Sequence, residues 1–273
     1  MLTKRLIACF DIINGMVTKA VRFQDNVHVG PAAQLAGAMY GAQIDELIFY
    51  DITASNERRG IDIEAVKRVA ERVFIPFTVG GGIKTLGDMY EALGAGAEKI
   101  SVDSMAVRRP ALITEGAKAF GAQCVVLSTQ VKREPRMPSG YEVYIDGARL
   151  ATGLDAMEWI KRGQELGAGE ICLNSIDNDG TLSGYDLALM KLAEKAVSVP
   201  LIASGGAGAP EHLAALFTGT QAQAAIISSM LYSPRMERNY TVRELKAHLA
   251  NSGVPVRPCS GGGEQESGGY HAN

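Results

Sequence analysis

Short apolar runs alternate with amphipathic segments along almost the whole chain. The apolar runs are four to six residues long and mostly continuous, which is typical of strands buried on both faces of a parallel sheet. The eight predicted strands are Leu6–Asp11, Glu46–Asp51, Pro76–Val79, Lys99–Val102, Val125–Ser128, Glu170–Asn174, Pro200–Ala203 and Ala224–Ile227. Amphipathic stretches between them predict helices, among them Ile63–Val73, Leu112–Phe120, Asp155–Leu166 and Leu187–Ala196.

Eight strand–helix units in 273 residues favour a closed barrel over an open doubly wound sheet, which remains the alternative on pattern alone. The predicted fold class is α/β, a (βα)8 TIM barrel with a two-fold half-barrel repeat. We expect residues 1–257 to form the barrel as a single domain. Residues 258–273 are rich in Gly and Ser, so we expect a disordered tail there.

The two halves of the chain resemble each other at a constant spacing. The segment DELIFYDI (Asp45–Ile52) matches GEICLNSI (Gly169–Ile176), and GGGI (Gly80–Ile83) matches SGGA (Ser204–Ala207), in both cases 124 residues later. A common offset indicates a duplicated half-barrel, with chance similarity between strand–helix units as the alternative. One segment breaks the alternation: Val131–Gly153 contains YEVYI, Asp-Gly and ARLA, which predicts a hairpin in the loop after the fifth strand.

Composition narrows the class of protein. Hydrophobic residues make up 47% and charged residues 21%, which excludes a mostly disordered chain, and the net charge of −3 argues against nucleic-acid binding. The four cysteines show no CxxC spacing, and no apolar run is long enough to span a membrane. We expect a cytoplasmic protein. No histidine has a ligand-like partner at helical spacing, so we expect no metal; the histidines are His28, His212, His248 and His271.

Two glycine-rich turns follow the third and seventh predicted strands, each with serine hydroxyls one strand later. Glycine lets main-chain N–H groups approach an anion, and such turns at the carboxyl end of a barrel are common phosphate sites. Two turns at the repeat spacing therefore predict a ligand with a phosphate at each end, whereas purely structural turns are the alternative. The residues concerned are Gly81, Gly82, Ser104, Gly205, Gly206, Ser228 and Ser229.

Charged residues gather at both ends of the predicted strands. Carboxylates at the carboxyl ends are candidate acids or bases at the mouth of the barrel, although aspartates also cap turns, a serious alternative for Asp179-Gly180. These carboxylates are Asp11, Asp51, Asp177 and Asp179. The amino ends carry two cations and two anions that can form a salt-bridge ring: Arg5, Glu46, Lys99 and Glu170. On the residues alone, a stabilising plug is the favoured interpretation of that ring.

Several blocks of the sequence resemble the cyclase subunit of imidazole glycerol phosphate synthase, over roughly Met1–Arg257 and in family order. They are RLIACFDI, IDELIFYDITAS, IPFTVGGGI, GAEKIS, GAGEI, SIDNDGTLSGYD, PLIASGGAG and TVRELKAHL. The resemblance implies a (βα)8 barrel that pairs with a glutaminase subunit, takes ammonia through its bottom, and needs no cofactor or metal. It implies attack on a bisphosphorylated ribulosyl-formimino precursor, giving imidazole glycerol phosphate for histidine synthesis and aminoimidazole carboxamide ribotide.

The resemblance also assigns roles residue by residue. It makes Asp11 a catalytic aspartate and turns the salt-bridge ring of Arg5, Glu46, Lys99 and Glu170 into an ammonia gate. It adds ligand-binding residues to the glycine turns and their serines: Lys19, Asp103, Asn174, Asp179 and Gly180.

Three regions depart from the family pattern. In loop one, Ile13-Asn14 replaces the usual Lys-Asp, and the stretch near Val27-His28 lacks the expected Arg-Asp. Gln130 stands where the family has its second catalytic aspartate, and loss of such a group typically costs about 10²–10⁴-fold in rate. Asp103-Ser104 stands where the family has Asn-Thr, and a carboxylate 4 Å from a phosphate charge would repel it by roughly 4 kcal/mol at an effective dielectric constant of 20.

These departures leave two alternatives to the family cyclase. One is a paralogue that delivers ammonia to another substrate in an amidino-sugar or natural-product pathway. The other is a non-catalytic barrel that binds and activates a glutaminase.

Overall fold

A closed barrel of eight parallel strands forms the centre of the protein. The computed structural model describes residues 2–21, 24–52, 60–233 and 236–260. The strands pair in the order β10-β11-β12-β1-β4-β5-β6-β7, and pairing of β7 with β10 closes the ring. Their bounds are β1 (Arg5–Ile13), β4 (Glu46–Asp51), β5 (Phe77–Gly80), β6 (Lys99–Val102), β7 (Val125–Arg133), β10 (Glu170–Ser175), β11 (Leu201–Ser204) and β12 (Ala224–Ile226). The predicted barrel is thus confirmed.

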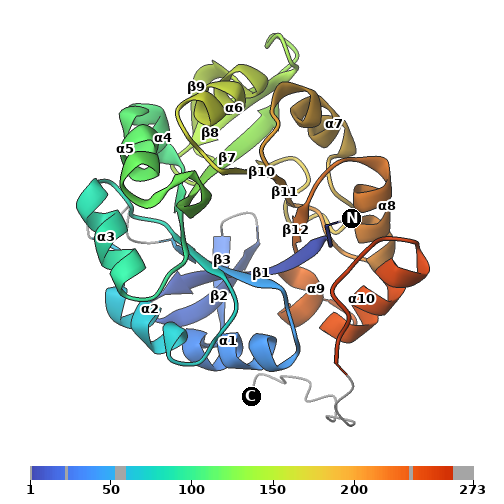
Figure 1. Cartoon of the computed structure of the whole chain (residues 1–273). Helices are drawn as coiled ribbons and strands as arrows, with labels where there is room; N and C mark the ends of the chain where they lie inside the picture. The colour runs from blue at the N-terminus through green and yellow to red at the C-terminus, as the bar shows by residue number, and fades with distance from the viewer. Residues whose placement is uncertain (1, 22–23, 53–59, 234–235, 261–273) are drawn as a thin grey trace.

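Helices surround this barrel on its outside (Figure 1). They are α1 (Ala32–Gly41), α2 (Ile63–Ala70), α3 (Leu86–Gly94), α4 (Ser104–Arg108), α5 (Ala111–Phe120), α6 (Ala156–Glu165), α7 (Leu187–Ala196), α8 (Pro210–Gly219), α9 (Ser229–Tyr232) and α10 (Val242–Asn251), with a 3₁₀ turn at Ala122–Cys124. Several begin where a side-chain oxygen accepts a main-chain N–H of the first turn, as at Asp155 and Asp186. Thr85 and Thr241 form capping boxes with Asp88 and Glu244. Within the described residues, no helix is both long and apolar enough to cross a membrane.

Two antiparallel hairpins extend the barrel at the carboxyl ends of its strands. β8 (Tyr141–Ile145) and β9 (Leu150–Asp155) form the hairpin predicted in the long fifth loop, and β8 also pairs with β7. Its turn at Asp146–Ala148 has positive φ throughout. The other hairpin, β2 (Met16–Val21) with β3 (Gln24–Pro31), was not predicted. Residues 261–273, most of the predicted tail, lie outside the described part of the chain.

Two hydrophobic cores hold the barrel together. The larger lies between the sheet and the helices, and the smaller lines the lumen of the barrel. Because side chains alternate across a strand, every second residue of each strand points into the lumen. The lumen core consists of Ile7, Cys9, Ile48, Val126, Cys172, Ile202, Ala224 and Ile226.

The same alternation places polar side chains on the lumen face at both ends of the strands. On β1, for example, Arg5 and Asp11 share the face of the lumen residues Ile7 and Cys9. The two charged residues are six positions apart, which is about 20 Å along a strand at roughly 3.3 Å per residue. The lumen therefore has a charged floor at its amino end and a polar rim at its carboxyl end.

Candidate active site

A closed ring of four ion pairs forms the floor of the lumen. Arg5 contacts Glu46 at 2.8 Å and Glu170 at 2.9 Å. Lys99 contacts the same two carboxylates, at 2.9 Å and 3.0 Å. Burial opposes the charge of the Arg5 guanidinium, but Glu46 and Glu170 outweigh this and raise its pKa. The ring has no net charge, and it brings together all four residues that the sequence singled out at this end.

A hydroxyl cluster sits above the ring, inside the apolar part of the lumen. Tyr50 lies within hydrogen-bond distance of Ser101 (3.3 Å) and donates to Ser128 (3.4 Å). A Cβ on Gly80 would overlap the aromatic ring of Tyr50, so the position of the Tyr50 side chain requires glycine at residue 80. Burial raises the pKa of the Cys172 thiol to about 12, which keeps the thiol protonated at neutral pH. Sequence reasoning missed Tyr50, although the alternation in ELIFYD places it on the lumen face with Glu46.

Asp11 stands at the rim, near the end of β1. Its side chain lies on the lumen face, and its main-chain carbonyl accepts a hydrogen bond from the Thr18 hydroxyl of the β2–β3 hairpin (3.3 Å). β2 continues through Lys19, whose side chain lies outside the described part of the structure. The carboxyl group of Asp11 is therefore directed to the mouth of the barrel by the strand that also supplies Arg5 to the floor.

Gln130 and Asp103 meet across the rim from Asp11. Gln130 lies on the lumen face of β7, and its Nε2 donates to Oδ2 of Asp103, the residue after β6, at 2.9 Å. Burial raises the pKa of Asp103 to about 7; the hydrogen bond from Gln130 acts in the opposite direction. Among the described residues, Gln130 Oε1 is buried and has no hydrogen-bond partner. Besides Asp11, the rim thus carries the carboxyl group of Asp103, whose pKa is raised.

A polar pocket lies at the rim beside the second glycine turn. Gly205 and Gly206 both have positive φ, and a Cβ on Gly206 would overlap the carbonyl oxygen of Gly184. Asn174 borders this pocket, because its Oδ1 lies 3.1 Å from the Cβ position of Gly205. The pocket is lined by Asp179, Gly180, Leu182, Ser204, Gly205, Gly206, Ala207, Ile226, Ser228 and Ser229. The structure therefore gathers six of the predicted substrate- or phosphate-binding residues around one cavity, with Asn174 at its border.

The first glycine turn has different surroundings. Gly81 and Gly82 have positive φ, and a Cβ on Gly81 would overlap the main chain of Asp51. The hydroxyl of Ser104 accepts a hydrogen bond from the main-chain N–H of Asp146 in the β8–β9 turn (2.9 Å). The two predicted phosphate sites are therefore alike in their glycine backbones and different in their side chains.

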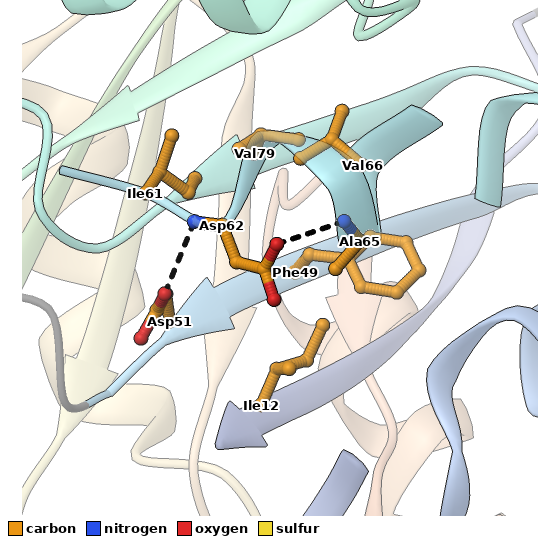
Figure 2. A pocket seen from close by; sticks show the side chains of 8 residues that line it. All are labelled: Ile12, Phe49, Asp51, Ile61, Asp62, Ala65, Val66 and Val79. Atoms are coloured by element: carbon orange, nitrogen blue, oxygen red, sulfur yellow. Dashed lines mark hydrogen bonds between the residues drawn. The ribbon is translucent and has the colours of Figure 1, made fainter. Parts of the chain in front are cut away.

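Two of the strand-end carboxylates accept main-chain hydrogen bonds, and one of them faces away from the lumen. Tyr50 faces the lumen, so its neighbour Asp51 faces the helices, where it borders a mainly apolar pocket between β4 and α2 (Figure 2). There Asp51 accepts from the Asp62 N–H (3.3 Å), and Asp62 caps α2 through Ala65 (3.0 Å). Asp177 accepts from the Arg133 N–H at 2.8 Å. The expectation that all strand-end aspartates point into the mouth was wrong for Asp51.

The described residues contain no group of three or more His, Cys, Asp or Glu side chains arranged to hold a metal ion. The described rim residues include carboxyl groups, an amide and glycine turns around a polar cavity.

Comparison with known proteins gives a consistent result. Residues 5–237 match the family described as "Histidine biosynthesis protein". The imidazole glycerol phosphate synthase subunit HisF of Desulfatibacillum aliphaticivorans is 52% identical over 260 residues, which cover 94% of this chain and 98% of the relative. The HisF subunits of Desulfosudis oleivorans and Oleidesulfovibrio alaskensis are 51% and 48% identical, each over 94% of this chain and 99% of the relative.

Proposed function

The chain belongs to the family of imidazole glycerol phosphate synthase HisF subunits, and from that membership we propose how its barrel works. It is the ammonia-dependent cyclase of histidine biosynthesis, a lyase-type enzyme. It converts the phosphoribulosyl-formimino precursor into imidazole glycerol phosphate and aminoimidazole carboxamide ribotide.

One observation supports this function above the others: the lumen joins the charge ring to Asp11. Arg5 and Asp11 lie on the same face of the same strand, with Ile7 and Cys9 between them. Ammonia is small and uncharged in its reactive form, so an apolar lumen transmits it while excluding ammonium. The ring of four ion pairs closes the entrance to this path without leaving a net charge there.

Asp11 supplies acid–base chemistry at the rim. When the lone pair of ammonia adds to an electrophilic carbon, the nitrogen gains a positive charge and must lose a proton. The Asp11 carboxylate faces the exit of the lumen and accepts this proton. The glycine turns at Gly81–Gly82 and Gly205–Gly206 hold the two phosphates of the substrate, and Lys19 adds a cation on the loop side.

The same arrangement defines the partner. A glutaminase subunit binds at the amino end of the barrel and releases ammonia beside the ring, so the working enzyme is a heterodimer in the cytoplasm. The carboxyl end stays open for substrate.

Conversion of the precursor with ammonium salts as the nitrogen source tests this function. We expect turnover by the isolated chain and a loss of about 10²–10⁴-fold in kcat for Asp11→Asn, since the amide cannot accept a proton. Asp51→Asn is the matched control: Asp51 is an aspartate at the end of the neighbouring strand that faces the helices, so this variant should keep wild-type kcat.

Two results would contradict the proposal. If wild type gave no product while a relative named HisF was active in parallel, the substrate assignment would be wrong and the paralogue would be favoured. If the chain formed no product but still stimulated a glutaminase, and Asp11→Asn stimulated it equally, the barrel would be a non-catalytic activator.

A further inference from the structure

We propose that Asp103 is the second acid–base residue of this site, held opposite Asp11 by the hydrogen bond from Gln130. This inference rests on the proposed function, because it concerns proton transfer during the same ammonia-dependent reaction. It gives a role to Asp103 and Gln130, two of the positions at which the sequence departs from its family.

The placement of Asp103 comes from the strand that precedes it. β6 directs Lys99 to the floor and Ser101 to the hydroxyl cluster, and the same alternation directs Asp103 to the rim. Gln130 lies on β7, which stands four strands from β1 in either direction around the ring. Asp103 and Gln130 therefore face the mouth from the side opposite Asp11.

The side chain of Asp103 is turned away from its own helix. Asp103 is the N-cap residue of α4, a position where an aspartate usually accepts an N–H of the first turn. Here the side chain makes no such bond; its Oδ2 accepts from Gln130 Nε2 at 2.9 Å, while the main-chain carbonyl takes the bond from Ala106. The carboxyl group is directed to the rim and does not serve helix capping.

The surroundings of Asp103 favour its protonated form. Burial raises its pKa to about 7, and the nearby carboxylate of Asp146 adds to this, whereas the Gln130 bond and Arg108 of α4 act in the opposite direction. Arg108 is itself paired with Asp146 at 2.6 Å, and the Cys172 thiol on β10 is uncharged at neutral pH. A carboxyl group that is half protonated near pH 7 is suited to proton transfer.

Gln130 can support Asp103 in both of its protonation states. An amide carries a donor and an acceptor, whereas an aspartate at this position would compete for the same proton. The amide N–H group donates to the Asp103 carboxylate at 2.9 Å, and the buried Oε1, unpartnered among the described residues, is available to accept from the protonated acid. Gln130 is therefore a positioning residue for Asp103.

Ammonia addition needs such an acid as well as a base. As the new C–N bond forms from the ammonia lone pair, the π electrons of the substrate C=O bond move to oxygen. That oxygen takes the proton of Asp103, and Asp11 accepts the proton that nitrogen loses. The sum is NH₃ plus C=O giving H₂N–C–OH, and one proton passed from Asp11 to Asp103 through water restores both groups.

Protonation also reconciles Asp103 with a phosphate at the Gly81–Gly82 turn. An ionised carboxylate 4 Å from the phosphate charge would repel it strongly at this rim. The uncharged acid does not, and a bound phosphate raises the pKa of Asp103 further. Substrate binding thus places Asp103 in the form that donates a proton.

Exchange of the two side chains tests the inference. The assay measures kcat/KM per concentration of free NH₃ from pH 5.5 to 9 for wild type, Asp103→Asn, Gln130→Asp and the double variant. We expect Asp103→Asn to lower kcat/KM by about 10²–10⁴-fold. The double variant should recover to within about tenfold of the wild-type kcat/KM, because it returns a carboxyl group to the pair. The wild-type kcat/KM should fall as pH rises through about 7. In the double variant this fall should occur at a different pH.

Glu115→Gln is the matched control, because Glu115 forms an exposed ion pair with Arg109 at 2.5 Å and is not among the groups that shift the pKa of Asp103. It should change kcat/KM less than threefold, a limit we set for the assay. The inference is wrong if Asp103→Asn stays within threefold of wild type. It is equally wrong if the kcat/KM of Gln130→Asp exceeds that of wild type by more than about 10²-fold, because the wild-type site would then lack an acid.

A titration of the Asp103 carboxyl carbon by ¹³C NMR separates this inference from the proposed function. If no protein in the series converts the precursor, the proposed function fails, and the titration alone decides the fate of Asp103. A midpoint between pH 6 and 8 in the free protein, lost in Asp103→Asn, supports the proton-transfer group; a midpoint below pH 5 overturns it.

Discussion

Lys99→Met should destabilise the barrel far more than an ordinary surface substitution. The ammonium group makes two of the four contacts of the floor ring, at 2.9 Å to Glu46 and 3.0 Å to Glu170. At an effective dielectric constant of 20, each such contact is worth about 5.5 kcal/mol before the cost of burying the charges. The substitution leaves two buried carboxylates to share Arg5, and breaking a buried ion pair in this way costs about 3–5 kcal/mol.

Calorimetry of five proteins measures this cost: wild type, Lys99→Met, Glu46→Gln, the double variant and one control. We expect the Tm of Lys99→Met to fall by roughly 6–20 °C. The double variant Lys99→Met/Glu46→Gln restores a neutral ring of Arg5 and Glu170, so it should be more stable than the sum of its single substitutions predicts, by about 1–3 kcal/mol. Lys67→Met is the matched control, because Lys67 forms a 2.8 Å pair with Glu64 on the exposed face of α2, where solvent screens the charges and an ion pair contributes little to stability.

If Lys99→Met costs no more than Lys67→Met, or if Lys99 and Glu46 show no coupling in the cycle, the ring is not a closed, buried network. The gate proposed at the floor would then lose its structural basis.

Two further predictions concern the rim. Gly206→Ala should lower stability by more than about 2 kcal/mol and raise KM for the precursor, because its Cβ would overlap the Gly184 carbonyl at positive φ; unchanged calorimetry and KM would show that the turn can relax. Gly219→Ala, at the end of α8 with no atom near its Cβ position, is the control and should leave both unchanged or slightly raise stability. For Asp103, whose pKa rises from 3.8 to about 7, the folded state holds a proton that the unfolded state releases above about pH 4. Wild-type unfolding free energy should therefore decline between pH 4 and 7 by up to about 4 kcal/mol more than that of Asp103→Asn, and parallel urea-unfolding profiles would contradict this.

The barrel itself could be predicted from the sequence because its signals are local and repeated. Glu46–Asp51, Lys99–Val102 and Leu187–Ala196 agree with the structure to the residue, since each is a compact apolar or amphipathic run between turns. The β2–β3 hairpin was missed because its strands, MVTKAV and QDNVHVGP, carry polar residues on both faces. No apolar period separates such strands from a loop.

The candidate site could be predicted only in part, because spacing along the chain fixes strand ends but not side-chain partners. The ring at the floor followed from four charged residues at equivalent strand positions, and the structure brings them into contact. Asp51 was misplaced because strand-end position was used without the alternation that Tyr50 fixes. The bond between Asp103 and Gln130 joins residues 27 positions apart, and neither side chain alone indicates it.

The central claim is that ammonia travels inside the barrel from the charge ring to Asp11. Its most direct test is isotopic: the chain with its glutaminase partner is supplied with glutamine labelled with ¹⁵N in the side-chain amide, in medium containing excess unlabelled ammonium. We predict that imidazole glycerol phosphate carries the ¹⁵N label undiluted, and that Lys99→Met lowers the labelled fraction. A product whose label matches the mixture of ammonia in the medium would contradict passage through the lumen.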